Sequence, residues 1–217
     1  MSTAKNCFFG TYCRLDLTSE GITAKPHGDT IVVGQEIKLE FESYVNERGK
    51  DTMRVAVKNL GDDLLGFLPA REAHRAFTCH NDGWVCKVAP SAVGFKESNR
   101  TFWAEVAIFC YAQDQTKIFD ALFDKVIHRM ADGERPSLNL SENTISRLLD
   151  GEDIDHEMKP TKAPKLPKGE AYYKTKQTQS EKMILAASKR NKGCYVGAAA
   201  VFVIIIAIIV FIVLKVI

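Results

Sequence analysis

Apolar and polar side chains alternate in several short runs between residues 7 and 110. The run Ile37–Glu42 alternates apolar with charged residues, and the run Met53–Lys58 repeats this pattern. A period of two predicts strands with one buried face. Further apolar runs, separated by residues typical of turns, predict four more strands at 7–15, 64–68, 84–89 and 102–110. Together these runs predict an antiparallel sheet or a small barrel.

A helical period replaces the alternation after residue 112. From Ile118 to Met130, apolar residues recur every three or four positions, with charged residues between them. This pattern predicts a long amphipathic helix, whose apolar stripe either completes the core or docks on a partner. Ser141 is suited to begin a shorter helix, and Gly151 to end it. With a further short helix after Pro69, the predicted fold class is α+β.

The composition changes beyond this helical region. We therefore expect residues 1–150 to form one globular domain. In the following stretch, Pro160, Pro164 and Pro167 alternate with lysines, a composition typical of an extended and mobile spacer. Residues 151–192 are thus predicted to be a flexible linker. It ends in a basic collar, whose cations closest to the following apolar run are Lys182, Lys189, Arg190 and Lys192.

Residues 195–214 contain no charged or strongly polar side chain. A helix of this length spans about 30 Å, the thickness of the hydrocarbon core of a bilayer. We therefore predict a single transmembrane anchor within residues 193–217; a buried helix is the alternative. Residues spaced along this predicted span are Tyr195, Val201, Ile205, Ile209 and Leu214.

The distribution of charge around the apolar run predicts its orientation. Cations precede the run, and only Lys215 follows it. The positive-inside rule then places the N-terminal domain in the cytoplasm. Residues 1–15 do not resemble a secretory signal, so we expect insertion after translation, as in tail-anchored proteins. Membrane lipids are the first predicted partner.

Nothing in the sequence indicates an enzyme. It contains no P-loop, nucleophile elbow, HExxH motif or dinucleotide-binding glycine pattern. The six cysteines should be reduced thiols in the cytoplasm. Cys79, His80 and Cys86 lack the spacing of a zinc site. We therefore expect no catalytic residue, no metal and no other cofactor.

One stretch carries a family resemblance. Gly34-Gln-Glu36 precedes a strand, a loop ends in Asp51, and Gly66-Phe-Leu-Pro69 opens a helix that contains Ala73. In this order, residues 30–77 resemble a HIRAN module. The resemblance implies a small SH3-like β-barrel that binds nucleic-acid ends. The binding residues that it implies are Arg48, Lys50, Asp51 and Arg54.

The same loop departs from the family pattern. Where HIRAN modules have an aromatic residue, this loop reads Glu47-Arg-Gly-Lys-Asp51, without a ring on which a base could stack. The domain also carries nearly equal numbers of acidic and basic residues, which disfavours phosphate binding. A protein partner recruited to the membrane is therefore expected, and nucleic-acid binding is the alternative. A third hypothesis is that the anchor itself assembles a membrane complex through small residues at 197–200.

The missing aromatic generates a first prediction. We expect the globular domain to bind single-stranded DNA no tighter than roughly 10⁻⁴ M at physiological salt. Fluorescence anisotropy with 3′- and 5′-ended oligonucleotides measures this. Micromolar, end-dependent binding that Arg48→Ala or Lys50→Ala weakens would restore the nucleic-acid hypothesis.

Overall fold

The computed structural model describes residues 7–45, 49 and 51–186. The chain divides into two compact units, Met1–Gln177 and Thr178–Ile217. In the second unit, residues 179–186 are helical. No helix among the described residues has the length and apolar character to cross a membrane. The predicted anchor at 193–217, with the collar residues Lys189, Arg190 and Lys192, lies outside the described residues.

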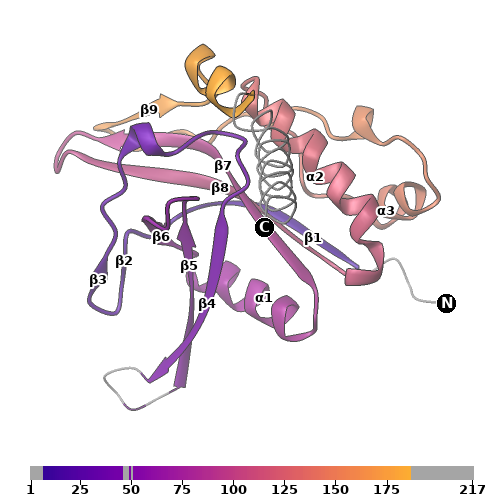
Figure 1. Ribbon diagram of the computed structural model, residues 1–217, viewed down its shortest axis with the longest axis horizontal. Coiled ribbons are helices and arrows are strands. Elements are labelled where there is room, and N and C mark those ends of the chain that lie inside the picture. Colours follow the sequence, from indigo (N-terminus) through magenta and orange to yellow (C-terminus); the bar gives the residue numbers. More distant parts are fainter. Residues whose placement is uncertain (1–6, 46–48, 50, 187–217) are drawn as a thin grey trace, which may run out of the picture. The chain divides into compact units, whose positions relative to one another are not determined.

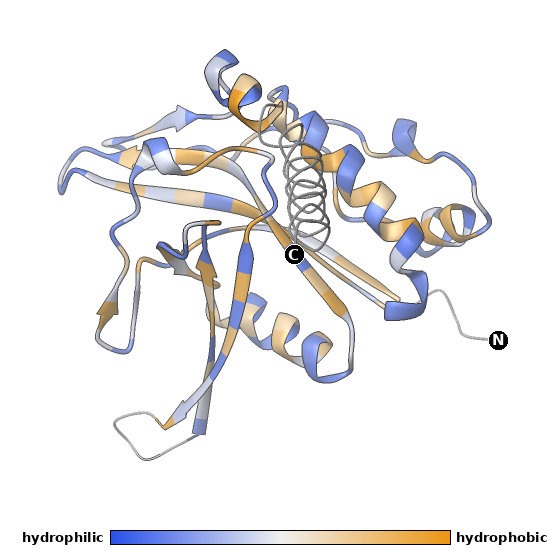
Figure 2. Cartoon of the chain, viewed as in Figure 1, coloured by the Kyte–Doolittle hydropathy of each residue, from blue (hydrophilic) through white to orange (hydrophobic). Residues whose placement is uncertain are grey.

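A four-stranded antiparallel sheet is the centre of the first unit (Figure 1). Its strands are β1 (Phe8–Arg14), β8 (Thr101–Tyr111), β7 (Val85–Lys96) and β9 (Glu170–Lys174), in that spatial order. The strands β7 and β8 form a long hairpin, coloured hydrophobic along much of its length in Figure 2. Gly94 of β7 is required there, because an added Cβ would lie 2.0 Å from the ring of Trp103 on β8.

Alternate residues of β8 enter two different cores. Phe109 and Tyr111 pack with α2 (Thr116–Ala131) and α3 (Glu142–Leu149) on one face of the sheet. Val106 and Ile108 pack on the other face with a second layer, described next. The predicted amphipathic stripe of α2 is confirmed as core, since its main apolar residues are buried in the first cluster: Phe119, Leu122, Phe123, Val126 and Met130.

The second layer combines a smaller sheet with a helix. Its strands are β4 (Lys38–Val45), β5 (Asp51–Lys58) and β6 (Leu64–Phe67), again antiparallel. Helix α1 (Ala70–Asn81) packs against β5, β7 and β8. Short elements complete the unit: the two-stranded ribbon β2 (Thr18–Ser19) and β3 (Ile22–Thr23), and the 3₁₀ turns η2 (Gly28–Thr30), η3 (Gln113–Gln115) and η4 (Asp155–Glu157).

The α+β class and the antiparallel sheets are confirmed, whereas the described strands do not form the predicted closed barrel. Among the described residues, the two sheets join through single bridges, Ile37 with Val88 and Asp16 with Phe67. One physical reason is Gly34, which takes a left-handed φ of +70° before the first bridge. An added Cβ there would lie 2.4 Å from the carbonyl oxygen of Ile127 on α2, so the chain turns against that helix instead of extending a strand.

The prediction of a flexible linker from residue 151 differs from the structure, because the first compact unit continues to Gln177. Ile154 and Met158 are buried in the core beneath α2, and β9 pairs with β7. Between them, the backbone of Thr161 donates to the carbonyl oxygen of Arg135. The lysine and proline residues are exposed, so a polar composition concealed a few buried anchoring residues.

The buried position of Met158 generates a prediction for stability. Met158→Ala should lower the free energy of unfolding by about 2–5 kcal/mol, because the side chain is 1% exposed and its removal leaves a cavity. Urea denaturation measures the change. Met183→Ala is the matched control, since Met183 is 62% exposed, and it should change stability by less than about 0.5 kcal/mol. Equal effects of the two substitutions would show that residues 151–177 do not belong to the core.

Candidate functional site

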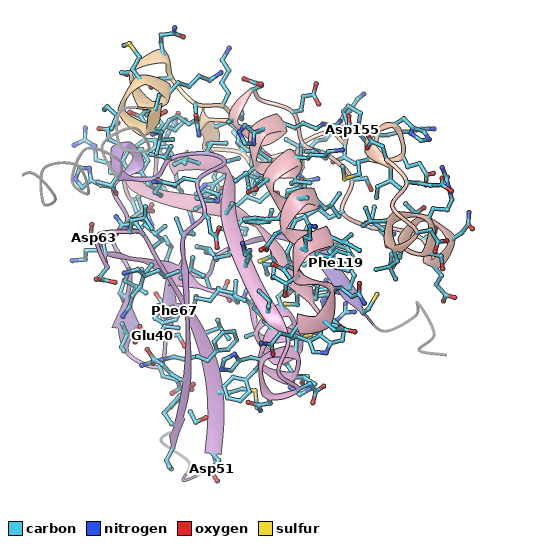
Figure 3. The ribbon with its side chains drawn as sticks, turned by 45° about the vertical axis from the view of Figure 1, so that its right-hand side comes forward. Glu40, Asp51, Asp63, Phe67, Phe119 and Asp155 are labelled. Atoms are coloured by element: carbon cyan, nitrogen blue, oxygen red, sulfur yellow. The ribbon has the colours of Figure 1, made fainter. Side chains whose placement is uncertain are left out.

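Of the four residues implied by the family resemblance, the structure describes two, Asp51 and Arg54. Arg48 and Lys50 lie outside the described residues. Asp51 begins β5 at the end of the β4–β5 hairpin (Figure 3). Arg54 follows three positions later on the same strand, so the two side chains leave opposite faces of the sheet.

Arg54 is already engaged within the small sheet. Its Nε donates to Glu42 on β4 at 2.5 Å. The guanidinium also lies over the rings of Tyr44 and Phe67, at 5.0 and 5.5 Å from their centroids. Because its charge is paired and its plane is stacked, Arg54 holds the β4–β5–β6 sheet together and offers little to an external phosphate.

A solvent-open groove beside α2 is a stronger candidate. It has a volume of about 490 Å³ and is lined by α2, α3 and the segment after α3. Leu122 and Ile154 are buried and form its floor. Half-buried Ile118 and Leu148 line it further, and Ala121 is exposed in it. This apolar surface, open to solvent, is suited to accept apolar side chains from another molecule.

The far side of the groove depends on how α3 ends. Gly151 takes a left-handed φ of +87°, its amide donates to Leu148, and the amide of Glu152 donates to Arg147. These two bonds form a Schellman motif, which ends the helix and turns the chain back. Asp153 and Ile154 then return toward α2. The turn at Gly151 therefore places the floor residue Ile154.

Charged pairs border the groove. Lys125 Nζ lies 2.8 Å from Asp153 Oδ1, and Arg147 Nε lies 2.6 Å from Glu152 Oε2. Lys117 forms no ion pair with any residue that the structure describes. Both signs of charge are thus present at the rim, and most of the charge is internally neutralised. The rim can orient a bound segment, while the apolar floor would supply most of the affinity.

A second depression continues along α2 toward its C-terminal end. It is lined by charged side chains and shares Lys125 and Asp153 with the groove. Arg129 crosses this depression, and its Nη1 donates to Asp155 Oδ1 at 3.1 Å. Asp155 lies in the segment after α3 and Phe119 on α2, as Figure 3 shows. The lining therefore changes from apolar in the groove to charged in the second depression, along the same helix α2.

A polar cluster behind α3 holds the returning segment in place. Ser141 Oγ accepts from the amide of Thr144, which confirms its predicted capping role. The buried Thr144 hydroxyl donates to Glu157 Oε2 at 2.6 Å, and Arg147 pairs with the same carboxylate. These hydrogen bonds, from Thr144 first and then Arg147, lower the pKa of Glu157. Glu157 thereby joins η4 to α3.

Three of the described thiols pack together in the second core. Cys79 and Cys86 are partly buried against Cys110 in the second core. The Cys110 thiol donates hydrogen bonds toward the sulfurs of Cys79 and Cys86, and these bonds, followed by burial, raise the pKa of Cys110. Within residues 7–45, 49 and 51–186, no group of three His, Cys, Asp or Glu side chains is placed to hold a metal ion.

Sequence reasoning found one side of the groove and missed the other. The apolar stripe of α2 was evident from its period, with a partner groove as the alternative to core. The opposite side comes from an acidic segment that was read as linker. Its only signal is that Ile154 and Met158 are two apolar residues four positions apart among charged ones.

Comparisons with protein-family models, with curated proteins and with solved structures give no match.

The cluster behind α3 generates a prediction for acid stability. Because the pKa of Glu157 is lowered in the folded state, its carboxylate stabilises the fold above the ordinary value of about 4.3. That contribution is lost as the pH falls through the folded pKa. Glu157→Gln should therefore lower the melting temperature at pH 7, and the difference should shrink below about pH 4. Glu97→Gln, on the exposed β7–β8 turn, is the control. A difference that stays constant from pH 7 to pH 3 would contradict this role.

Proposed function

We propose that this chain is a membrane-tethered binding module, which holds a segment of a partner protein in the groove beside α2. The observation that carries the proposal is the open apolar surface formed by Ile118, Leu148 and Ala121 above the buried floor. In a hydrophobic core, other side chains of the same chain would cover these apolar residues. Apolar side chains that stay open to solvent are typical of binding sites.

The shape and chemistry of the groove define the class of segment that it would take. One wall is a helix, and the floor residues Leu122 and Ile154 come from opposite sides of the groove. An amphipathic helix that inserts apolar side chains at positions i and i+4 matches a groove of this kind. Lys117 at the rim, which forms no ion pair with a described residue, favours acidic residues beside those apolar anchors.

The tether is proposed from the sequence alone. The apolar run at 195–214 has the length of a membrane span, and cations precede it. The groove would then face the cytoplasm, and the partner would be concentrated at that membrane surface. In this proposal, the tether serves only to attach the chain to the membrane.

We propose in addition that residues 30–77 form a HIRAN-like module in which the ring of strands stays open. Support comes from the order of elements, β4, β5, β6 and α1, which follows the motif order of the resemblance. Nucleic-acid binding by this module has less support, because Arg54 is paired with Glu42 and stacked.

A pair of matched substitutions tests the groove. Ala121 and His74 are both exposed positions within helices, on α2 and α1. Ala121→Arg should fill the groove without removing a core contact, whereas His74→Arg adds the same side chain elsewhere. Chemical cross-linking in intact host membranes, read by mass spectrometry, should give a specific adduct with the natural chain and with His74→Arg, and at least tenfold less with Ala121→Arg. The melting temperatures of both variants should stay within a few degrees of the natural chain.

Removal of residues 193–217 separates the two parts of the proposal. The truncated chain should appear in the soluble fraction and still form the same adduct on cross-linking. An adduct that Ala121→Arg leaves unchanged would refute the groove as the binding site. Release of the full chain from membranes by carbonate would refute the tether.

A further inference from the structure

Unpaired cations lie on two segments that meet at the end of the β7–β8 hairpin. Lys96 ends β7, Arg100 lies on the turn that follows, and the segment that leads into β9 carries Lys162, Lys165 and Lys168. All five side chains belong to exposed residues. We call these five residues the basic edge.

The cations of the basic edge differ from most other cations of the first unit in having no ion-pair partner among the described residues. Most other lysines and arginines of the first unit are held by acidic partners, as Lys38 is by Asp62 and Lys87 by Asp120. None of the five residues of the basic edge forms an ion pair with any residue in the described part of the chain. The acidic groups near them are Glu97, which follows Lys96, Glu170, whose charge is taken by Arg14, and Asp29, which accepts from the Tyr173 hydroxyl at 2.6 Å. A net positive field therefore remains at this end of the sheet.

The two segments of the basic edge are fixed to each other by the fold. Strand β9 pairs with β7 so that Lys96 lies opposite Glu170, and the amide of Glu97 donates to Gly169 at 3.0 Å. The Tyr172 hydroxyl donates to the carbonyl oxygen of Pro164 at 2.8 Å, which holds the lysine-bearing segment beside the sheet. Figure 1 shows β9 alongside the end of the β7–β8 hairpin.

An ion pair and an aromatic stack lock β9 in this place. Arg14 of β1 forms two hydrogen bonds with Glu170, at 2.6 and 3.2 Å. The same guanidinium lies 4.1 Å from the ring centroid of Trp103, and Trp103 meets Tyr172 edge to face. The cations therefore sit on a built surface rather than on a free strand of chain.

Aromatic side chains lie next to the cations on the other face of β9. Tyr173 is 48% exposed and packs edge to face on Phe102, which in turn contacts Phe95. Exposed tyrosines beside lysines are typical of surfaces that rest at the headgroup level of a membrane. The rings of Phe95, Phe102 and Tyr173 pack against one another, which leaves less ring surface on which a nucleic-acid base could stack.

The length of chain after β9 keeps this surface close to the proposed tether. About twenty residues separate Lys174 from Tyr195, and because residues 179–186 are helical, this stretch reaches at most about 55 Å. A helical path over the same residues covers only about 30 Å. A tether of this length would keep the body beside the membrane, where even weak attraction between the basic edge and lipid would orient it.

We infer that the basic edge docks on anionic lipid headgroups of the membrane that holds the tether, and so fixes which face of the body is turned away from the lipid. The inference rests on the proposed tether. Each cation brought near an anionic leaflet strengthens such contact about fivefold. The attraction falls with ionic strength, because the Debye length at physiological salt is about 8 Å.

Lysine labelling on vesicles tests the docking with the full chain. The chain is reconstituted with vesicles of phosphatidylcholine alone or with about one third phosphatidylserine, and is acetylated briefly with a membrane-impermeant reagent. Mass spectrometry should show Lys96, Lys162, Lys165 and Lys168 labelled at least threefold more slowly on the phosphatidylserine vesicles. Lys117, exposed on α2 and without an ion pair among the described residues, is the internal control and should react equally on both. Salt at 0.5 M should abolish the difference.

Variants and flotation separate the docking from the tether. Lys96→Glu combined with Lys168→Glu should remove the protection of Lys162 and Lys165, whereas His74→Glu, at an exposed position on α1, should leave it intact. If the chain floats with neutral vesicles and shows no lipid-dependent protection, the docking is wrong and the tether stands. If it fails to float with neutral vesicles but is protected on anionic ones, the tether is wrong and the lipid site stands. Protection by a soluble oligonucleotide, without protection by phosphatidylserine, would assign the edge to nucleic acid and overturn the inference.

Discussion

The structure of the first unit depends on β8 being buried on both faces. Its residues from Trp103 to Tyr111 are each at most 6% exposed, because α2 covers one face and the smaller sheet with α1 covers the other. Antiparallel sheets commonly leave one face to solvent. Here neither face can be released without opening a core. Every element that lines the groove or the basic edge is held, directly or through one neighbour, against this strand or its partner β7.

Double burial leaves one charge that must be neutralised inside the sheet. Glu105 lies on β8 and is 6% exposed. Arg135 donates to both of its carboxylate oxygens, at 2.9 and 3.2 Å, and Ser91 donates at 2.7 Å. A buried carboxylate without such partners would cost several kcal/mol. The pairing therefore draws the chain after α2 onto the sheet, and Arg135 in turn binds the hydroxyl of Thr161. The contact between Arg135 and Thr161 helps to hold the charged stretch after α3 against the first unit.

The sequence predicted the individual strands and helices well. It did not predict that the strands leave the barrel open. Alternation identified β4, β5 and β8, the helical period identified α2, and Ser141 and Gly151 marked the ends of α3. These signals are local. The open ring depends on Gly34 meeting the backbone of α2, far along the chain, and no local pattern reports that contact. Residues 151–177 were misjudged because their anchoring residues are few among prolines and lysines, and strand β9 gains its partner only when β7 is in place. The groove could not be predicted for the same reason, since one of its sides comes from residues 151–177.

The segment from Gly151 to Lys174 joins the two proposed surfaces. It supplies Ile154 to the floor of the groove and the three lysines of the basic edge, with Met158 and Thr161 fixed to the body between them. Occupation of the groove and contact of the edge with lipid would each restrain this segment, so ordering by one reduces the entropy lost in the other. Such coupling needs no rearrangement of either sheet. It requires only that the segment open at a lower free energy than the two cores, and the segment has few buried side chains. A partner held in the groove would then favour docking of the edge, and an anionic membrane would favour the partner by the same factor.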